Sequence, residues 1–292
     1  MMKKNGSIAL LGLALSLSLF SCSDSDTDSY SLYNQKNNAI SFYSHLYSSK
    51  SQDDADAYVG IGYKEHQAES ENFTYSGLKN YALKEASSPN HSIKIHRIIG
   101  QGNYVFLHIE EKEGNATIAR GELFKFNSNG KIIEHWGNLQ IQPDITASGR
   151  TMFDGASINY KLTSGEENIT KFQKADTDMF NNLDYSIVEA TRVATTSSTV
   201  YKQHNPYIKD GREQLGLWFT QMKNQGTKLI MTNKVILAEG DFIVEMNHMN
   251  TNNGEDQELI FDMIRVRPED GYTDEHWDIV QSVLGKDLTK IF

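Results

Sequence analysis

The segment GYTDEHW (271–277) repeats the ending Glu-His-Trp of GKIIEHW (130–136), and its histidine lies 141 residues after the earlier one. Two further segments recur in the same order at an offset of 138 residues: YKEHQ (63–67) as YKQHN (201–205), and GNYV (102–105) as GDFI (240–243). Self-similarity at a nearly fixed period is the mark of a repeated unit. The sequence therefore predicts a tandem duplication of one small domain, with the three extra residues in a hairpin loop between the last two segments.

The length of the chain, 292 residues, is sufficient for two domains that each bury a core. We expect the first domain at 35–145 and the second at 166–292. Between them, residues 146–165 are rich in glycine and hydroxyl residues, which is typical of a linker.

Each copy begins with helical patterns and ends with strand patterns. Apolar residues spaced by three and four predict helices over 39–47 and 78–83 in the first copy, and over 169–188 and 215–222 in the second. Alternating patterns predict strands over 104–109, 119–126 and 132–141, with Asn129-Gly130 as a hairpin turn. Helices followed by an antiparallel meander predict an α+β domain, with helices packed on one face of a curved sheet.

The N-terminus has the features of a secretory signal. Lys3 and Lys4 precede an apolar run, 8–20, that is too short to span a bilayer as a helix. The run ends in Leu-Phe-Ser-Cys at 19–22, which resembles the lipobox of bacterial lipoproteins, and Cys22 is the only cysteine. We therefore expect a signal peptide at 1–21, a lipid on Cys22, and a location in the bacterial cell envelope as an outer-membrane lipoprotein, periplasmic or surface-exposed.

Residues 22–34 are polar, acidic and low in complexity, and we expect a flexible tether that resembles the acidic export tags of some Gram-negative surface lipoproteins. With no second cysteine, the mature domains have neither disulfides nor cysteine catalysis. The formal charge is −10, and no Lys/Arg cluster interrupts the acidic excess beyond the first four residues, so we expect no nucleic-acid partner.

A family resemblance rests on four pieces of the second copy: YKQHNP (201–206), DG (210–211), EGDFI (239–243) and EHWDIVQ (275–281). This pattern resembles the SnoaL-like polyketide cyclase and aldol-condensation family of the nuclear-transport-factor-2-like superfamily. The first copy matches more loosely, through His66, Gly102, His108 and its own Glu-His-Trp. The resemblance implies two cone-like domains, each with a curved sheet that encloses a pocket.

The resemblance also implies a catalytic residue. In the cyclases the aspartate that ends the last motif is the general acid/base, and that position is Asp278 here; the first copy has Gly137 instead. Strand alternation places His276 on the same face as Asp278, and the resemblance places Asp262 across from Asp278. Two carboxylates in an apolar cavity would raise one carboxyl pKa, which suits proton transfer alpha to a carbonyl.

Further ligand-binding candidates are aromatic and imidazole side chains of the repeated segments. Another is His248, which shares one strand face with Val244 and Met246. Each has a structural alternative: Asp262 and Asp278 as strand-end hydrogen-bond acceptors, the repeated histidines as caps or hairpin locks, and the tryptophans as core. The candidate ligand-binding residues are His204, His248, His276, Trp277, His66, His108 and His135.

None of these histidines has the local spacing of a metal site, so we expect no metal and no cofactor. Two functions stay open at this stage. One is a small apolar or carbonyl ligand bound in the second copy with cyclase- or isomerase-like acid/base chemistry; the other is a non-catalytic binding or structural module. The copies could also pair through their sheets within the chain, or chains could form a homodimer. The sequence leaves the enzyme question undecided.

Overall fold

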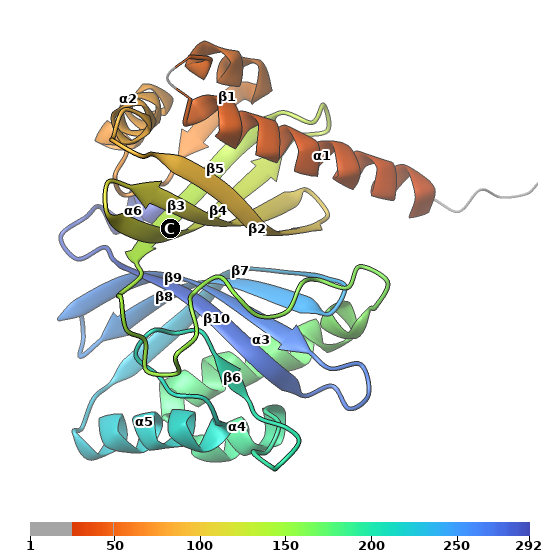
Figure 1. Cartoon of the computed structure of the whole chain (residues 1–292), viewed down its shortest axis with the longest axis vertical. Helices are drawn as coiled ribbons and strands as arrows, with labels where there is room; N and C mark the ends of the chain where they lie inside the picture. Colours follow the sequence, from red (N-terminus) through yellow and green to blue (C-terminus); the bar gives the residue numbers. More distant parts are fainter. Residues whose placement is uncertain (1–24, 49) are drawn as a thin grey trace, which may run out of the picture.

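The computed structural model describes residues 25–48 and 50–292 and contains two α+β domains, each a five-stranded sheet with its longer helices on one face (Figure 1). This confirms the predicted fold class. The elements of the first domain are α1 (Ser25–Leu46), η1 (Gln52–Tyr58), β1 (Val59–Glu65), η2 (Glu71–Phe73), α2 (Tyr75–Ala86), β2 (Ser92–Gln101), β3 (Tyr104–Glu113), β4 (Ala116–Phe126) and β5 (Ile132–Ile141). Those of the second are α3 (Ser164–Asn182), α4 (Tyr185–Thr191), β6 (Lys202–Gln203), α5 (Arg212–Asn224), β7 (Leu229–Glu239), β8 (Phe242–Thr251), β9 (Asp256–Val266), β10 (Thr273–Ser282) and α6 (Leu288–Ile291).

The two sheets have the same topology. Their strand orders are β1-β5-β4-β3-β2 and β6-β10-β9-β8-β7. Four strands of each sheet form the expected antiparallel meander, and the fifth pairs in parallel at the edge, β1 with β5 and β6 with β10. In the first sheet the Asn129-Gly130 turn joins β4 to β5, with Gly130 at φ +70, a conformation that glycine adopts without strain.

The helices agree with the apolar spacing, with two differences. The expected helix over 169–188 is divided into α3 and α4 at Leu183, whose left-handed φ of 48 ends α3, and Asp184 then caps α4 through its side chain. Helix α1 begins at Ser25, inside the segment that the sequence suggested as a tether. The expected signal peptide and Cys22 lie outside the described residues. No helix of the described residues is long and apolar enough to cross a membrane.

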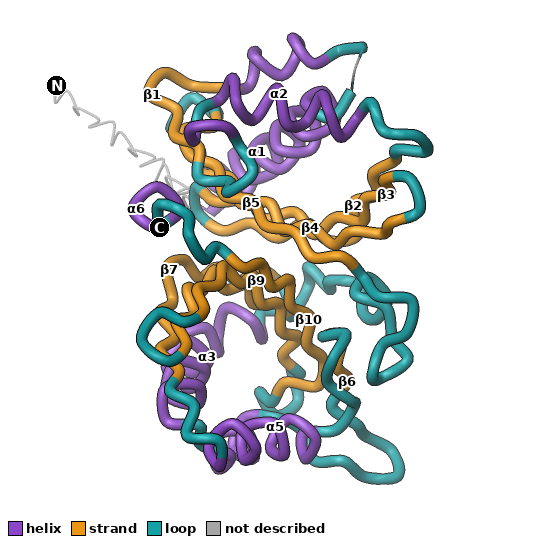
Figure 2. The backbone as a smooth tube through the Cα atoms, turned by 90° about the vertical axis from the view of Figure 1, so that its left-hand side faces the viewer, coloured by secondary structure: helices purple, strands orange, loops and turns teal. Residues whose placement is uncertain are grey.

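The sheets of the two domains pack against each other through the faces that their own helices leave uncovered (Figure 2). Phe106 of β3 lies against Phe261 of β9, with ring centroids 5.1 Å apart. One hydrophobic cluster includes fully buried residues of both sheets, among them Ile99, Trp277 and Val244. Burial of this shared apolar face makes the two domains one packed body.

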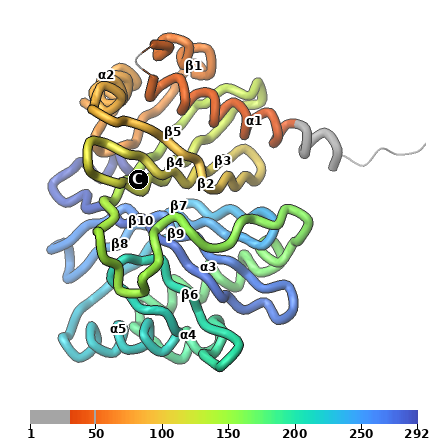
Figure 3. The backbone as a smooth tube through the Cα atoms, viewed as in Figure 1, coloured from red at the N-terminus to blue at the C-terminus, as the bar shows by residue number. Residues whose placement is uncertain are grey.

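Residues 142–163, which we call the strap, contain no helix or strand and run along one side of both sheets (Figure 3). The strap is packed: Met152 and Phe153 are buried, and the indole of Trp277 donates to the Asp154 carbonyl at 2.9 Å. Gly155 has φ +94, and a Cβ there would lie 2.2 Å from a Glu275 oxygen. Only glycine allows the strap to approach the second sheet this closely.

Candidate functional site

The second domain contains a cavity of about 550 Å³ between its sheet and helices α3 and α5. One end of the cavity is polar and is built from the loop after β6 and from strands β9 and β10. The other end is apolar and rich in methionine and aromatic side chains. The residues of the polar end include Gln203, Asn205, Asp262, His276 and Asp278; the apolar ones include Phe180, Leu215, Trp218, Met222, Met231 and Met249.

Asp262, His276 and Asp278 meet at the polar end; alternation predicted a common face for His276 and Asp278, and the family resemblance implied Asp262 opposite Asp278. Asp278 pairs directly with Asp262 across β10 and β9, so both carboxylates share one face of the sheet. The imidazole of His276 bridges two groups: Nε2 lies 3.1 Å from Asp262 Oδ1, and Nδ1 lies 2.7 Å from the amide oxygen of Gln203. Burial opposes the charged imidazole, but the hydrogen bond to Asp262 and the negative charge of Asp278 raise the pKa of His276 overall. The imidazole thus lies between two oxygen atoms that can accept hydrogen bonds, an arrangement that favours its charged form.

Asp278 is the group of this cluster that is free to react. Its side chain is buried, and Asn205 Nδ2 donates to Oδ2 at 2.7 Å. Among the described residues, Oδ1 has no hydrogen-bond partner. Burial raises the pKa of Asp278 to about 6, assisted by Asp262 and opposed by His276 and Asn205. A carboxyl group with this pKa exchanges a proton readily near neutral pH.

A second layer of polar side chains holds Asp262 in place. Asn247 Nδ2 donates to Asp262 Oδ2 at 2.8 Å and also to Glu245 at 3.2 Å. Burial raises the pKa of Glu245 well above its ordinary value, as do the charges of nearby Asp176 and Asp262. The sequence motifs did not indicate a role in the site for four of these residues: Gln203, Asn205, Glu245 and Asn247. The available signal was alternation: in an extended segment, Gln203 and Asn205 necessarily flank His204 on the opposite face.

That same alternation overturns the assignment of His204, Trp277 and His66 to a pocket. The ring of His204 stacks on Trp277 with centroids 4.6 Å apart, and its Nε2 lies 3.0 Å from Glu275. In the first domain His66 stacks on Trp136 at the same separation, 4.6 Å. These residues lie on the face of each sheet that is opposite the helices. The strap and the other domain pack against that face. The repeated histidine and Glu-His-Trp segments therefore form one structural unit in each copy.

The expected row of Val244, Met246 and His248 is also on the wrong face. Val244 and Met246 belong to the core between the domains, whereas Glu245, Asn247 and Met249 face the cavity side. His248 stacks on Phe292 with centroids 4.3 Å apart, and its Nε2 bonds Gln257 at 2.6 Å.

His108 lies on the corresponding face of the first domain. Its ring is fully buried beside Phe153 of the strap, and Nδ1 lies 3.1 Å from the guanidinium of Arg97. Burial lowers the pKa of His108 well below its ordinary value, and the charge of Arg97 lowers it further. This imidazole accepts a hydrogen bond from Arg97.

His135 of the first domain is buried, and two protein carboxylates occupy both of its ring nitrogens. Its Nε2 lies 2.7 Å from Glu122 and its Nδ1 lies 3.1 Å from Glu65. A Cβ added to Gly137, the position equivalent to Asp278, would lie 2.5 Å from a Glu122 oxygen. The interior of this domain is further occupied by the buried side chains of Tyr43, Tyr47, Glu111 and Arg120.

Asp262, His276 and Asp278 each offer one atom that could bind a cation, and these three atoms lie within 4.8 Å of one another. Metal binding requires a neutral imidazole with a free lone pair. Because the pKa of His276 is raised and Asp262 already bonds its Nε2, the arrangement fits a hydrogen-bonded acid–base group better than a metal centre.

No model of a known protein family matches the chain, and no curated protein matches it. Solved structures that resemble it include TsrD from Streptomyces laurentii, with 16% identity over 39% of this chain and 89% of that one, at a TM-score of 0.33. A SnoaL-like protein of unknown function from Burkholderia thailandensis gives 13% identity over 40% of this chain and 96% of that one, at a TM-score of 0.32. An LEH-like epoxide hydrolase from M. tuberculosis gives 18% identity over 44% of this chain and 88% of that one, at 0.31. At these values the chemistry must be argued from the site itself.

Proposed function

We propose that the second domain binds a small, largely apolar carbonyl compound and transfers a proton on it, in a cyclase- or isomerase-like reaction. The observation that carries this proposal is Asp278, a buried carboxyl group with one free oxygen, at the polar end of an open cavity of about 550 Å³. The size and the largely apolar lining of this cavity suit a drug-sized organic molecule.

The remaining polar groups have complementary tasks in this proposal. Asp278 in its charged form accepts a proton from the carbon alpha to the carbonyl and returns it at another position, so the net reaction needs no co-reactant. The protonated His276, oriented by Asp262 and Gln203, supplies positive charge beside the negative charge that develops on the carbonyl oxygen. Asn205 donates to one Asp278 oxygen and leaves the other without a hydrogen-bond partner among the described residues.

The second candidate function is ligand binding without turnover. It is supported by the first domain, in which the same fold has a filled interior and glycine at the catalytic position. The duplication therefore tolerates complete loss of the acid/base group in one copy. The open cavity with both aspartates in its wall favours the enzyme for the second copy.

The discriminating experiment compares Asp278→Asn with Asp256→Asn, which removes an equal charge at the exposed rim of the same cavity. A library of apolar ketones and enones is screened by thermal shift on the full chain, because a ligand of the folded state raises its melting temperature. Hits are then incubated in deuterated water and examined for exchange or rearrangement.

For an acid/base role we expect Asp278→Asn to reduce turnover by roughly 10² to 10⁴-fold with ligand binding retained, and Asp256→Asn to have little effect. Unchanged turnover in Asp278→Asn would overturn the assignment. Hits that bind without exchange or rearrangement in any of the proteins would establish the binding module instead.

We further propose that the chain is held at a bacterial envelope membrane by a lipid on Cys22, on the basis of the apolar run and lipobox-like ending at 8–22. A buried acyl chain contributes about 0.8 kcal/mol per methylene, and stable anchoring takes more than one chain. The site would then act on ligands in the envelope.

A further inference from the structure

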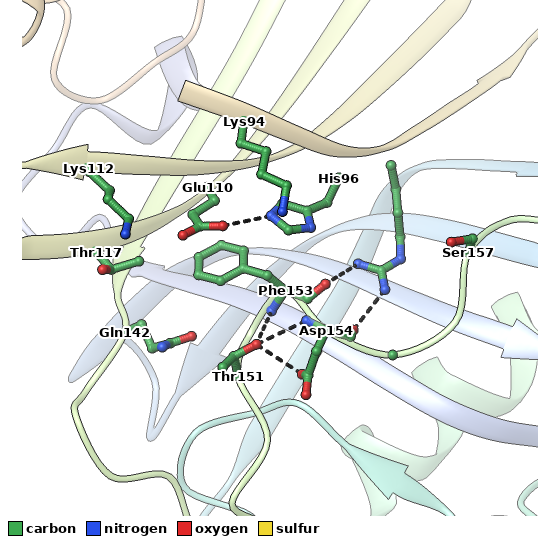
Figure 4. A pocket seen from close by; sticks show the side chains of 12 residues that line it. Lys94, His96, Glu110, Lys112, Thr117, Gln142, Thr151, Phe153, Asp154 and Ser157 are labelled. Atoms are coloured by element: carbon green, nitrogen blue, oxygen red, sulfur yellow. Dashed lines mark hydrogen bonds and ion pairs between the residues drawn. The ribbon is translucent and has the colours of Figure 1, made fainter. Parts of the chain in front are cut away.

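A second cavity, of about 620 Å³, lies between the strap and the β2–β3 face of the first domain (Figure 4). It shares no lining residue with the cavity of the second domain. We call it the strap cleft. The proposed acid/base chemistry makes no use of it.

A β-bulge gathers cationic side chains at this cleft. Ile95 pairs with Ile109 and Arg97 pairs with His108, so His96 is the extra residue of β2. A bulge lets two successive side chains lie on the same side of a sheet and is a common device for re-aiming them. As a result Lys94, His96 and Arg97 all line the cleft, and Lys112 joins them from β3.

The two lysines are free of protein carboxylates. Neither Lys94 nor Lys112 forms an ion pair or a side-chain hydrogen bond with any residue that the structure describes, although acidic residues outnumber basic ones by ten in the chain. Both side chains reach from the sheet into the cleft in Figure 4. Glu110 lies opposite Lys94 across the strands, but its carboxylate bonds His96 Nε2 at 2.8 Å.

The other acid of the cleft, Asp154, is also engaged. Thr151 Oγ1 donates to its carboxylate at 3.0 Å, and His204 Nδ1 lies 3.0 Å from the same oxygen. The cleft is thus lined by three permanent cations, Lys94, Lys112 and Arg97, and by two carboxylates that already have partners. This balance leaves a positive potential in a protein of strongly negative net charge.

Arg97 adds charge from the floor of the cleft, where the carboxylates of Glu275 and Asp154 act on it only from beyond ion-pair distance. Its guanidinium lies over the Trp277 ring at 4.2 Å and donates only to strap carbonyls and to His108, including the Asp154 carbonyl at 2.8 Å. No acidic side chain of the described residues lies within ion-pair distance of it. Carbonyl groups satisfy the donors but leave the unit charge.

Neutral donors complete the lining. The amide oxygen of Gln142 accepts from the Met152 backbone N–H at 2.8 Å, so its NH₂ group is the end left for a ligand. Thr117 and Ser157 offer hydroxyl groups on opposite sides of the cleft. Ammonium, amide and hydroxyl donors around one space are the groups that bind oxyanions.

We propose that the strap cleft binds a small organic polyanion that carries carboxylate or phosphate groups, held mainly by Lys94 and Lys112. The volume of the cleft is far larger than the roughly 30 Å³ that one water molecule occupies in the liquid. It therefore favours an organic ligand over a single inorganic phosphate. Two lysines on neighbouring strands favour at least two oxyanion groups in one molecule. Since the strap contacts both domains, a ligand here would bridge the first sheet and the strap next to Trp277.

The test uses the full chain at low ionic strength, with citrate as the tricarboxylate probe and inorganic pyrophosphate as the phosphate probe. Binding of each is measured by isothermal titration calorimetry for the unchanged chain, for Lys94→Gln/Lys112→Gln, and for Lys64→Gln/Lys228→Gln. The last variant removes the same charge from exposed lysines outside the cleft. In parallel, acetylation of each lysine is mapped by mass spectrometry with and without probe.

We expect at least one probe to bind, to bind roughly tenfold or more weakly to the cleft variant, and to bind the control variant normally. The bound probe should protect Lys94 and Lys112 from acetylation, and added salt should weaken binding. Preference for citrate or pyrophosphate identifies carboxylate or phosphate as the natural group. If neither probe binds, or if both variants bind equally well, the proposal fails; the result has no bearing on Asp278, because the two cavities share no residue.

Discussion

Gln140 and Gln281 occupy the same position in the last strand of the two copies, and each accepts a hydrogen bond from the backbone of the other domain. Val280 N–H donates to Gln140 Oε1 at 2.8 Å, and Leu139 N–H donates to Gln281 Oε1 at 3.0 Å. Reciprocal contacts between equivalent positions are the property of a two-fold interface. The two domains of this chain thus pack with the pseudo-symmetry of a homodimer. The two glutamines differ in one respect: Gln140 lines the cavity of the second domain, whereas Gln281 does not line it.

This asymmetry predicts different effects for Gln140→Ala and Gln281→Ala. Each leaves one backbone N–H of the interface without its acceptor, so each should cost about 1–3 kcal/mol in the free energy of unfolding. Only Gln140→Ala should also change the affinity of a ligand in the cavity of the second domain. Urea unfolding and ligand titration of both variants test this, and equal effects on ligand affinity would contradict it.

The buried ion pairs of His135 predict a stability loss that depends on pH. Burial disfavours the charged imidazole, but Glu65 and Glu122 raise the pKa of His135 to about 10. A raised histidine pKa stabilises the fold fully below the ordinary value near 6.5, and this contribution is lost as pH rises through the folded value. His135→Gln leaves two buried carboxylates without their cation and should cost about 3–5 kcal/mol at pH 6.

The comparison for this change is His276→Gln, because His276 has only one carboxylate partner, Asp262, and its other partner is the neutral Gln203. We expect a smaller loss there. Chemical denaturation at pH 6 and pH 9 should show the cost of His135→Gln shrinking at the higher pH. A cost that is the same at both pH values would mean that His135 contributes through packing rather than charge.

The stacked histidine and tryptophan residues of the repeated segments belong to the scaffold of the two α+β domains and not to the cavity, for a physical reason. The segments that recur, His66 with Trp136 and His204 with Trp277, stack on each other and lock the edge strand of each sheet. A structural unit of this kind is needed in both copies, so it stays recognisable in the sequence. The cavity is needed in one copy only, and its residues differ: Asp278 against Gly137, and Gln203 against Glu65.

Alternation within one strand placed His276 and Asp278 on a common face, and the family resemblance implied Asp262 opposite them, but neither could relate that face to β8. Which side of β8 faces the cavity depends on the register between β8 and β9, where Glu245 pairs with Asp262. A shift by one residue exchanges the two faces, and no residue pattern of β8 fixes that shift because both of its faces are buried. The strap could not be predicted either, since its packing depends on Arg97, which is distant in sequence.

Lipid attachment predicts a change in partitioning for Cys22→Ala. The unchanged chain, expressed in a Gram-negative host, should incorporate labelled fatty acid and enter the detergent phase on Triton X-114 separation, because buried methylenes favour the apolar phase. Cys22→Ala should do neither, while Ser23→Ala, a neighbouring change of similar size, should behave as the unchanged chain. A chain with intact Cys22 that stays unlabelled and aqueous would refute the anchor.

The raised pKa of Asp278 predicts that this residue destabilises the fold at neutral pH. Because the folded pKa of about 6 exceeds the ordinary value of 3.8, the folded chain binds more protons than the unfolded chain between these values, and stability falls as pH rises through that window. Asp278→Asn removes this penalty and keeps an oxygen that can accept from Asn205. Relative to the unchanged chain, it should therefore gain up to about 3 kcal/mol between pH 4 and pH 7. Urea unfolding across this range measures the gain, and Asp144→Asn, at an exposed position, is the control that should show none. If Asp278→Asn shows no gain in the free energy of unfolding, Asp278 is charged in the cavity without a cost in stability. It is then not poised for proton transfer.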